Sequence, residues 1–300
     1  MIIQNDIKSR TDWKKFLLNL DALEKIVQFI IKSNNISTNK IKQINLGTNV
    51  IFDLGKYILK IYAVDEETNS FMDWSREIIL SNLLKSSSPY VTPRIIKSGY
   101  FKDYYRIYYN IMEKINNLSS FSDIINDTTS LQYKYCIQEL HNIISFFHSL
   151  KININVAKQY SRPLRNYIAI KNEYDKYLKK YFSLNTTLNF GIVHGDLSES
   201  NIYFNEKGEI VILDFEDWMY APDIVEYPIV CFELLKSSQV RIEFLNDTSF
   251  EMIEKLIVAT LLHHESEKFL KLISLQMGKD KLPSISELRL FYSNQLLSKS

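Results

Sequence analysis

Residues 190–218 constrain the fold of this chain more than any other part of its sequence. Two short runs that begin with apolar residues occur here, and each leads to a carboxylate. Ile-Val, followed by His-Gly, precedes Asp196, and Ile-Val-Ile-Leu precedes Asp214. An amide side chain, Asn201, follows the first carboxylate five residues later. Apolar runs of this length predict buried strands, so the polar groups are expected where strands open into loops. Such loops suit catalytic groups because the strands hold them in place.

The residue types of this block favour phosphoryl transfer. Asn201 and Asp214 offer the hard oxygen ligands that Mg²⁺ prefers, and Asp196 can accept a proton from an alcohol. An ordinary turn would also explain His-Gly-Asp taken alone. Ser198 and Ser200 suggest a nucleophile, but the Gly-x-Ser-x-Gly pattern of α/β-hydrolases is absent from the sequence, as is the Asp-x-His pair of metallophosphoesterases.

The composition is that of an ordinary globular protein. The 300 residues are 46% hydrophobic and 24% charged, and the formal net charge is +1. These values exclude a disordered or collagen-like chain, and they give no global field that would attract nucleic acid or an anionic membrane. Since no apolar segment approaches the length of a membrane span and the amino terminus lacks a secretory pattern, we expect a cytoplasmic protein with reduced Cys136 and Cys231.

The spacing of apolar residues predicts two parts of different character. A leading helix is expected over about residues 11–33, capped by Thr11 or Asp12. Strands over 41–46, 49–54, 57–62, 94–99 and 104–112, with a helix over 71–84, predict a small antiparallel sheet that has a tight hairpin at Gly55. Helices are expected after Met112, over about 137–150, 164–181 and from residue 224 to the end, so the fold class is α+β.

The sequence His194-Gly-Asp196-Leu-x-x-x-Asn201, followed by Ile-Leu-Asp214-Phe-Glu, resembles the aminoglycoside phosphotransferase and choline kinase family of protein-kinase-like enzymes. The resemblance extends over about residues 41–270. It implies a two-lobed protein-kinase-like fold with an antiparallel-sheet lobe over 1–112, a hinge over 113–118 and a larger, mostly helical lobe over 119–300. It also implies that Asp196 orients and deprotonates the acceptor hydroxyl, while Asn201 and Asp214 hold Mg²⁺ against the phosphates of ATP or GTP.

In the first lobe, the resemblance implies nucleotide-binding roles for residues of a loop, a strand, the next helix and the hinge. These residues are Gly47, Thr48, Asn49, Lys60, Glu77, Glu113 and Ile115. The loop backbone would cover the phosphates, Lys60 would bind them and pair with Glu77, and the hinge backbone would meet the adenine. Taken alone, Lys60 could equally lie on an exposed strand face, and Glu77 could be an ordinary solvated helical residue.

The supporting residues of the predicted site are His194, Ser198, Glu216 and Glu226. Where the family usually has Asp-Leu-Ala after the metal motif, this chain has Glu226-Tyr-Pro, and Glu226 is expected to support the catalytic loop instead. Asp214 is followed by Phe-Glu rather than Phe-Gly, and the phosphate loop has one glycine rather than three. Both departures favour a small-molecule kinase over a protein kinase.

Two charged groupings allow alternative explanations. Five acids without an intervening Lys or Arg lie within residues 214–226: Asp214, Glu216, Asp217, Asp223 and Glu226. They would attract a cationic acceptor such as an amino sugar, unless metal ligation and solvated turns account for them. His263-His264 suggests a metal site, but adjacent helical positions point about 100° apart, so a surface helix face is expected.

The sequence therefore predicts a kinase that transfers the γ-phosphoryl group of ATP or GTP to a hydroxyl of a small molecule. The acceptor is expected to be an amino sugar, a sugar, a choline-like compound or a relative of these, aminoglycoside antibiotics included, bound by residues within 164–181 and 244–290. A non-catalytic scaffold of the same fold, binding a nucleotide or a partner, is the alternative from a different class, and a protein kinase is a second one. The scaffold is disfavoured because Lys60, Glu77, Asp196, Asn201 and Asp214 are all present.

Overall fold

The computed structural model of the chain describes residues 7, 9–46, 48–64, 70–102, 106–164, 172–184 and 189–297. The chain divides into two compact units: unit 1 consists of Met1–Leu118 and Asn205–Glu216, and unit 2 of Ser119–Phe204 and Asp217–Ser300. The predicted helical lobe includes residues 205–216, whereas in the structure this segment belongs to unit 1. Two backbone hydrogen bonds join β9 (Ile210–Ile212) to Val91 there. The Val91 N–H donates to the Ile210 carbonyl at 2.9 Å, and the Val91 carbonyl accepts from the Ile212 N–H at 3.0 Å.

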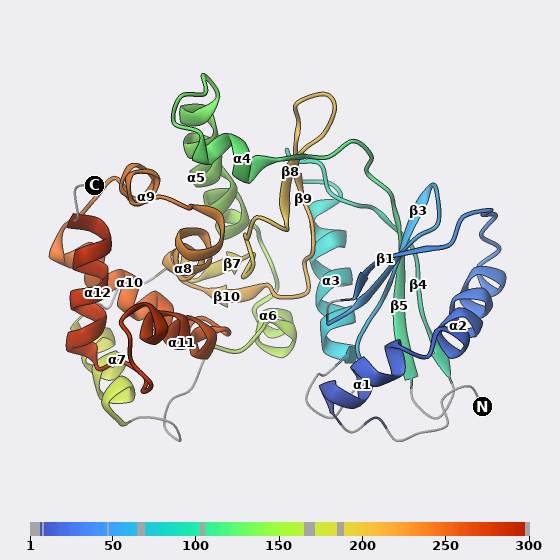
Figure 1. The fold of residues 1–300 in the computed structure, drawn as a ribbon, viewed down its shortest axis with the longest axis horizontal. Coiled ribbons are helices and arrows are strands. Elements are labelled where there is room, and N and C mark those ends of the chain that lie inside the picture. Colours follow the sequence, from blue (N-terminus) through green and yellow to red (C-terminus); the bar gives the residue numbers. More distant parts are fainter. Residues whose placement is uncertain are drawn as a thin grey trace. The chain divides into compact units, whose positions relative to one another are not determined.

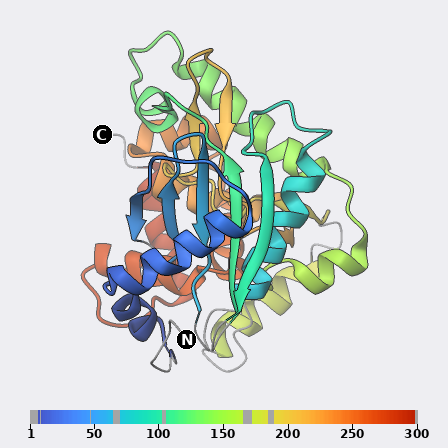
Figure 2. The same ribbon diagram turned by 90° about the vertical axis from the view of Figure 1, so that its right-hand side faces the viewer.

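Unit 1 is built on an antiparallel sheet. Its further elements are α1 (Arg10–Leu17), α2 (Leu20–Ser33), β1 (Lys42–Leu46), β2 (Val50–Asp53), β3 (Tyr57–Ile61), α3 (Ser70–Leu84), β4 (Ile95–Lys102) and β5 (Arg106–Glu113). The strand order is β1-β2-β3-β5-β4, and Gly55 makes the turn between β2 and β3 with a φ of +82°. Helix α2 lies on one face of the sheet and α3 on the other (Figure 1), and α2 crosses over the strands (Figure 2). The predicted sheet, hairpin and second helix are therefore present.

The predicted leading helix is two helices. The Ser9 hydroxyl caps α1 by accepting from the Asp12 N–H at 3.2 Å, and the Asn19 side chain caps α2 by accepting from the Ala22 N–H at 3.2 Å. The prediction that Thr11 or Asp12 caps the start is wrong, because both lie inside α1. Both helices bury apolar residues in the core of the sheet, so the apolar spacing continues through the break. This spacing therefore does not reveal that the helix is divided in two.

Unit 2 is mostly helical. Its strands are β6 (Ser119–Ser120), β7 (Gly191–Val193), β8 (Ile202–Phe204) and β10 (Met219–Ala221), and it has a short 3₁₀ helix, η1 (Asp223–Glu226), and a short π-helix, η2 (Val230–Leu234). Its helices are α4 (Phe121–Asn126), α5 (Tyr133–Ser149), α6 (Ile154–Tyr160), α7 (Asn172–Leu184), α8 (Tyr227–Ile229), α9 (Ser238–Leu245), α10 (Phe250–Leu262), α11 (Ser266–Gln276) and α12 (Ile285–Leu297). β7 pairs antiparallel with β10, and α10 is buried along most of its length and packs against η1. These contacts hold the loop that follows β7.

Two helix predictions for unit 2 differ from the structure, and one strand of unit 2 has no counterpart in the predictions. Helix α5 begins four residues before the predicted position 137. Leu164, where the next helix was predicted to start, is not helical, residues 165–171 lie outside the described part, and α7 begins at Asn172. Strand β10 was not predicted, since its three residues are too few to show alternation.

The remaining predictions for the chain as a whole concern membrane spans and cysteines. Among the described helices, none is long and apolar enough to cross a membrane. Cys136 and Cys231 are both buried, and each is a free thiol.

Candidate functional site

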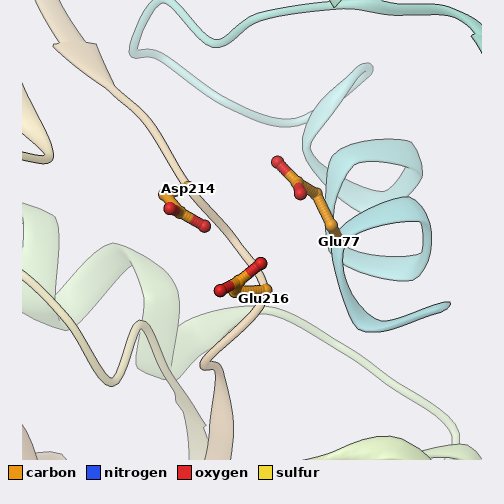
Figure 3. Close-up of side chains that lie close together, drawn as sticks. All are labelled: Glu77, Asp214 and Glu216. Carbon is orange, nitrogen blue, oxygen red and sulfur yellow. The ribbon is translucent and has the colours of Figure 1, made fainter. Parts of the chain in front are cut away.

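Strand β3 places Lys60 in the interior of unit 1. Its side chain is 3% exposed, and its Nζ lies 2.8 Å from a Glu77 carboxylate oxygen, 2.8 Å from Asp214 Oδ1 and 2.9 Å from Glu216 Oε2. Glu77 comes from α3, whereas Asp214 and Glu216 come from the segment after β9 (Figure 3). The predicted pair of Lys60 with Glu77 is present, the exposed-face alternative is excluded, and Glu216 is a partner that the sequence did not indicate.

The environment of Lys60 keeps it charged. Burial by itself would lower the pKa of Lys60, but the nearby carboxylates of Asp214, Glu216 and Glu77 raise this pKa well above its usual range. The Tyr62 hydroxyl donates a hydrogen bond to Glu77, and the Asn110 amide donates to Tyr62 at 2.8 Å. Burial raises the pKa of Glu77, although the Lys60 ammonium opposes this rise. Three carboxyl groups thus surround one ammonium in this cluster.

Asp214 is the member of the cluster with the best access for a metal ion. Within the described residues, Glu77, Asp214 and Glu216 offer carboxylate oxygens that lie within 4.8 Å of one another. The Asp214 side chain is 34% exposed, compared with 3% for Glu77 and 11% for Glu216. Its backbone has a φ of +60°, which is uncommon for a residue other than glycine. Residues with such backbone angles occur preferentially at functional sites. The oxygen donors of this group are of the kind that Mg²⁺ prefers.

The predicted nucleotide-binding loop is anchored to this cluster through Asn49. The buried Asn49 amide donates to Glu216 Oε2 at 2.6 Å, and its oxygen accepts from the Ala63 N–H at 3.1 Å. The Thr48 carbonyl accepts from the Trp13 indole at 3.0 Å. Gly47 lies outside the described residues. The Asn49 side chain therefore holds the loop in place, and it is engaged with Glu216 and Ala63.

The predicted hinge follows the end of β5. The Glu113 N–H donates to the Arg94 carbonyl at 2.9 Å, and the Glu113 carboxylate pairs with the Arg94 guanidinium at 2.6 Å. The Lys114 N–H donates to the Lys56 carbonyl at 3.1 Å, and Ile115 is half-buried. These bonds order the backbone that is predicted to meet the adenine.

In unit 2, the loop after β7 brings Asp196 and Asn201 together. The Asn201 amide donates to Asp196 Oδ2 at 2.7 Å and to the Asp196 carbonyl at 2.9 Å. Both bonds use the amide nitrogen, so the Asn201 oxygen is the atom suited to ligate a metal. His194 is fully buried, packs edge-on against Phe147 at 5.4 Å, and accepts from the Asp196 N–H at its Nδ1 at 3.2 Å. His194 thus supports the loop.

Ser198 is part of the same turn. Its hydroxyl shares a hydrogen bond of 2.8 Å with the Ser200 hydroxyl, and its carbonyl accepts from the Asn201 N–H at 3.1 Å. A serine nucleophile needs a base within hydrogen-bond reach. The partner of this hydroxyl is another hydroxyl, so its environment is that of a turn residue and not of a nucleophile.

Glu226 lies under the loop and holds it on both sides of Asp196. Its Oε2 accepts from the Gly195 N–H at 2.8 Å, and its Oε1 accepts from the Leu197 N–H at 3.0 Å. Burial raises the pKa of Glu226 to about 7, although these backbone hydrogen bonds oppose the rise. Glu226 therefore contacts the loop as predicted, although its side chain is longer than the aspartate that the family usually has at this position.

The five acids of residues 214–226 do not form one acidic surface. Glu216 pairs with Lys60 in unit 1. In unit 2, Asp217 pairs with Arg162 at 2.6 Å, Glu226 binds backbone N–H groups, and Asp223 is the exposed one of the five. The cationic partners are distant in sequence, which is why the run looks uncompensated when it is read along the chain. Neither explanation from the sequence covers the whole run, because Glu216, Asp217 and Glu226 hold side-chain cations or backbone N–H groups. Asp223 is the acid that fits a solvated turn.

The expectation that His263 and His264 lie on a surface helix face is wrong. His263 is fully buried and forms the carboxyl-terminal cap of α10. Burial lowers the pKa of His263 well below its usual range, and the neighbouring His264 lowers it further. His264 follows the helix, and its Nε2 lies 3.0 Å from the Gly195 carbonyl oxygen. Only the spacing of the two histidines at the end of an apolar helix could have drawn attention to them.

Comparisons with known proteins indicate one family and one fold. The family model described as "Phosphotransferase enzyme family" matches residues 48–234. The GDP and kanamycin complex of APH(2")-IIIa has a TM-score of 0.60 and 13% identity, covering 92% of this chain and 99% of that one. The choline kinase LicA from Streptococcus pneumoniae has a TM-score of 0.55 and 17% identity, with coverages of 92% and 99%. The gentamicin complex of APH(2")-IIa has a TM-score of 0.54 and 15% identity, with coverages of 92% and 96%. A comparison with curated protein sequences finds no match.

Proposed function

Because this chain belongs to the phosphotransferase enzyme family and has the protein-kinase-like fold, it is a small-molecule kinase, and we propose that it transfers the γ-phosphoryl group of ATP or GTP to an acceptor hydroxyl. The observation that carries the proposal is Lys60, buried and ion-paired with both Glu77 and Asp214. Burying a charged cluster of this kind costs free energy, so a chain with no use for it has no reason to retain it. The Asp196–Asn201 pair of unit 2 supports the same function.

In this mechanism, Lys60 binds the phosphates of the nucleotide. Glu77 and Glu216 hold its ammonium at 2.8 and 2.9 Å, so that it is oriented before the nucleotide arrives. The transition state of phosphoryl transfer is loose, and catalysis depends mainly on position and on charge compensation. A fixed cation meets both requirements without reorganisation.

Asp196 is the general base. It accepts the proton of the acceptor hydroxyl as that oxygen forms its bond to the γ-phosphorus, while the bond to the nucleoside diphosphate breaks. The Asn201 amide orients the carboxylate by its hydrogen bond to Oδ2 at 2.7 Å. Glu226 supports this by holding the N–H groups of Gly195 and Leu197.

Asn201 and Asp214 are the residues that would hold Mg²⁺. Both offer oxygen atoms of the kind that Mg²⁺ prefers, and Asp214 lies in a group of three carboxyl side chains. When bound, Mg²⁺ supplies neutralisation of the charge on the phosphates.

The acceptor is a hydroxyl compound among amino sugars, sugars and choline-like molecules. The similar structures include an aminoglycoside phosphotransferase with kanamycin and a choline kinase. In unit 2, however, three of the described acids have cationic partners: Asp217 pairs with Arg162, and Glu233 and Glu265 both pair with Lys268. We therefore infer that positive charge is no requirement for the acceptor, and that neutral sugars belong in the panel beside aminoglycosides and choline.

The test is a transfer assay with γ-labelled ATP and GTP against kanamycin, gentamicin, choline and neutral sugars. We expect label to pass from one nucleotide to at least one acceptor, and Asp196→Asn to abolish this transfer while it still binds nucleotide. Nucleotide binding without transfer to any acceptor would support the non-catalytic scaffold and refute the proposal.

A further inference from the structure

Side chains of unit 2 hold both backbone polar groups of Gly195, the residue that precedes the proposed base. Its N–H donates to Glu226 Oε2 at 2.8 Å, and its carbonyl oxygen lies 3.0 Å from His264 Nε2. A carbonyl oxygen can only accept, so Nε2 of His264 carries the proton and donates it. Gly195 has a φ of +81°, and a Cβ at this position would overlap the Asp217 carbonyl, so the fit of the loop here is close.

His264 is itself held firmly. Its ring stacks on the buried His263 ring, with centroids 4.5 Å apart and an angle of 27° between the planes. His263 is fixed because its N–H donates to the Ala259 carbonyl at 3.0 Å and its Nδ1 accepts from the Glu265 N–H at 3.1 Å. Helix α10, which ends here, packs against η1, the element that carries Glu226. Glu226 and His264, the two side chains that bond to the backbone of Gly195, therefore lie on or next to elements that pack against each other.

The His264 bond acts on the peptide group that joins Gly195 to Asp196. The oxygen of this group accepts from His264, and its N–H, which belongs to Asp196, donates to His194 Nδ1 at 3.2 Å. A peptide group is planar, so holding it at both ends fixes its orientation. That orientation decides where the Asp196 side chain leaves the backbone.

We propose that His264 is a positioning residue for phosphoryl transfer, which keeps the Asp196 carboxylate aligned by holding the Gly195 carbonyl. This inference rests on the proposed function, since it assigns His264 a part in that reaction. Misplacement of a catalytic group by about 1 Å costs up to about 100-fold in rate, so loss of the bond is expected to lower kcat by roughly 10- to 100-fold. The KM for nucleotide should stay unchanged, because Lys60 and its partners belong to unit 1 and make no use of this bond.

The test compares four variants. His264→Gln keeps an amide N–H at about the reach of Nε2, whereas His264→Asn has the same chemistry on a side chain too short to reach the carbonyl. His264→Ala removes the donor entirely. His148→Ala is the matched control, because His148 Nε2 also lies near a carbonyl, that of Asn189 at 3.2 Å, but does not contact the Gly195–Asp196 peptide group.

Two measurements are made on each variant. Steady-state kinetics, with the nucleotide and acceptor that the transfer assay identifies, give kcat and KM. Hydrogen exchange of the Asp196 and Leu197 amides reports the hold on the loop without any substrate. We expect the Asn and Ala variants to lower kcat and to speed this exchange about tenfold, the factor that corresponds to one hydrogen bond. The Gln variant should restore both values, and His148→Ala should change neither.

Wild-type kcat in His264→Asn, or unchanged exchange at Asp196 and Leu197, would overturn the inference. Equal losses in the Gln and Asn variants would also overturn it, because a purely structural role does not depend on the reach of the donor. Failure of the proposed function is distinguishable from these results. In that case the wild-type chain would transfer phosphate to no acceptor, while the exchange rates would still decide whether His264 holds the loop.

Discussion

The buried carboxyl of Glu226 predicts that stability and activity depend on pH in opposite directions. Its pKa is about 7 in the folded chain, against 4.5 for the ordinary group. Between these values the folded chain binds a proton that the unfolded chain has lost. Raising the pH from 4.5 to 7 should therefore lower the free energy of unfolding by about 3 kcal/mol. The contribution of Glu226 to the free energy of unfolding is fully present below pH 4.5 and is lost above pH 7.

Activity should change the other way. The ionised carboxylate accepts from the N–H groups of both Gly195 and Leu197. Protonation turns one of its oxygens into a hydroxyl, which is a poorer acceptor and needs a partner of its own. We therefore expect kcat to fall as the pH decreases through about 7, with the loop around Asp196 less firmly held.

Urea unfolding followed by tryptophan fluorescence at pH 4.5, 5.5, 7 and 8 measures how the free energy of unfolding depends on pH. Glu226→Gln cannot titrate, so its unfolding free energy should lack the fall of about 3 kcal/mol between pH 4.5 and 7 that the wild type shows. Glu254→Gln is the control: although burial alone would raise the pKa of Glu254, hydrogen bonds from Arg289 and Tyr177 lower it, so its contribution changes only below this range. Identical pH slopes for wild type and Glu226→Gln would refute the reasoning.

The charged groups of the two units allow three direct tests. Lys60→Met leaves the carboxylates of Glu77 and Glu216 uncompensated, so urea unfolding should show a loss of about 3–5 kcal/mol, and unchanged stability would contradict the buried ion pairs. Asp196→Asn keeps the hydrogen bonds but removes the proton acceptor, so kcat should fall by about 10² or more in the transfer assay; a kcat near the wild-type value would exclude Asp196 as the base. Asp214→Ala should abolish the tightening of ATP binding by Mg²⁺ in calorimetry, and equal tightening in both proteins would rule out the ligand role.

Local patterns in the sequence were sufficient for most of unit 1 and for the expectation that Asp196 and Asn201 lie in one loop. The hairpin at Gly55 could be predicted because a turn of this kind requires a residue that tolerates positive φ between two apolar runs. The proximity of Asp196 and Asn201 could be expected because they are five positions apart in one tight loop. The break at Asn19 escaped prediction because a capping side chain interrupts a helix without interrupting its apolar spacing.

Tertiary structure alone decided which partners the charged and polar groups acquire. Glu216 reaches Lys60, which is 156 positions earlier in the sequence, Arg162 reaches Asp217, and His264 reaches Gly195. No local pattern links such residues, since packing brings them together and burial then requires each polar group to find a partner. The sequence by itself therefore determined which residue types the site would use, because motif spacing is local. The fold determined how each is held, because buried charges and peptide groups are satisfied only by whatever the packed core places beside them.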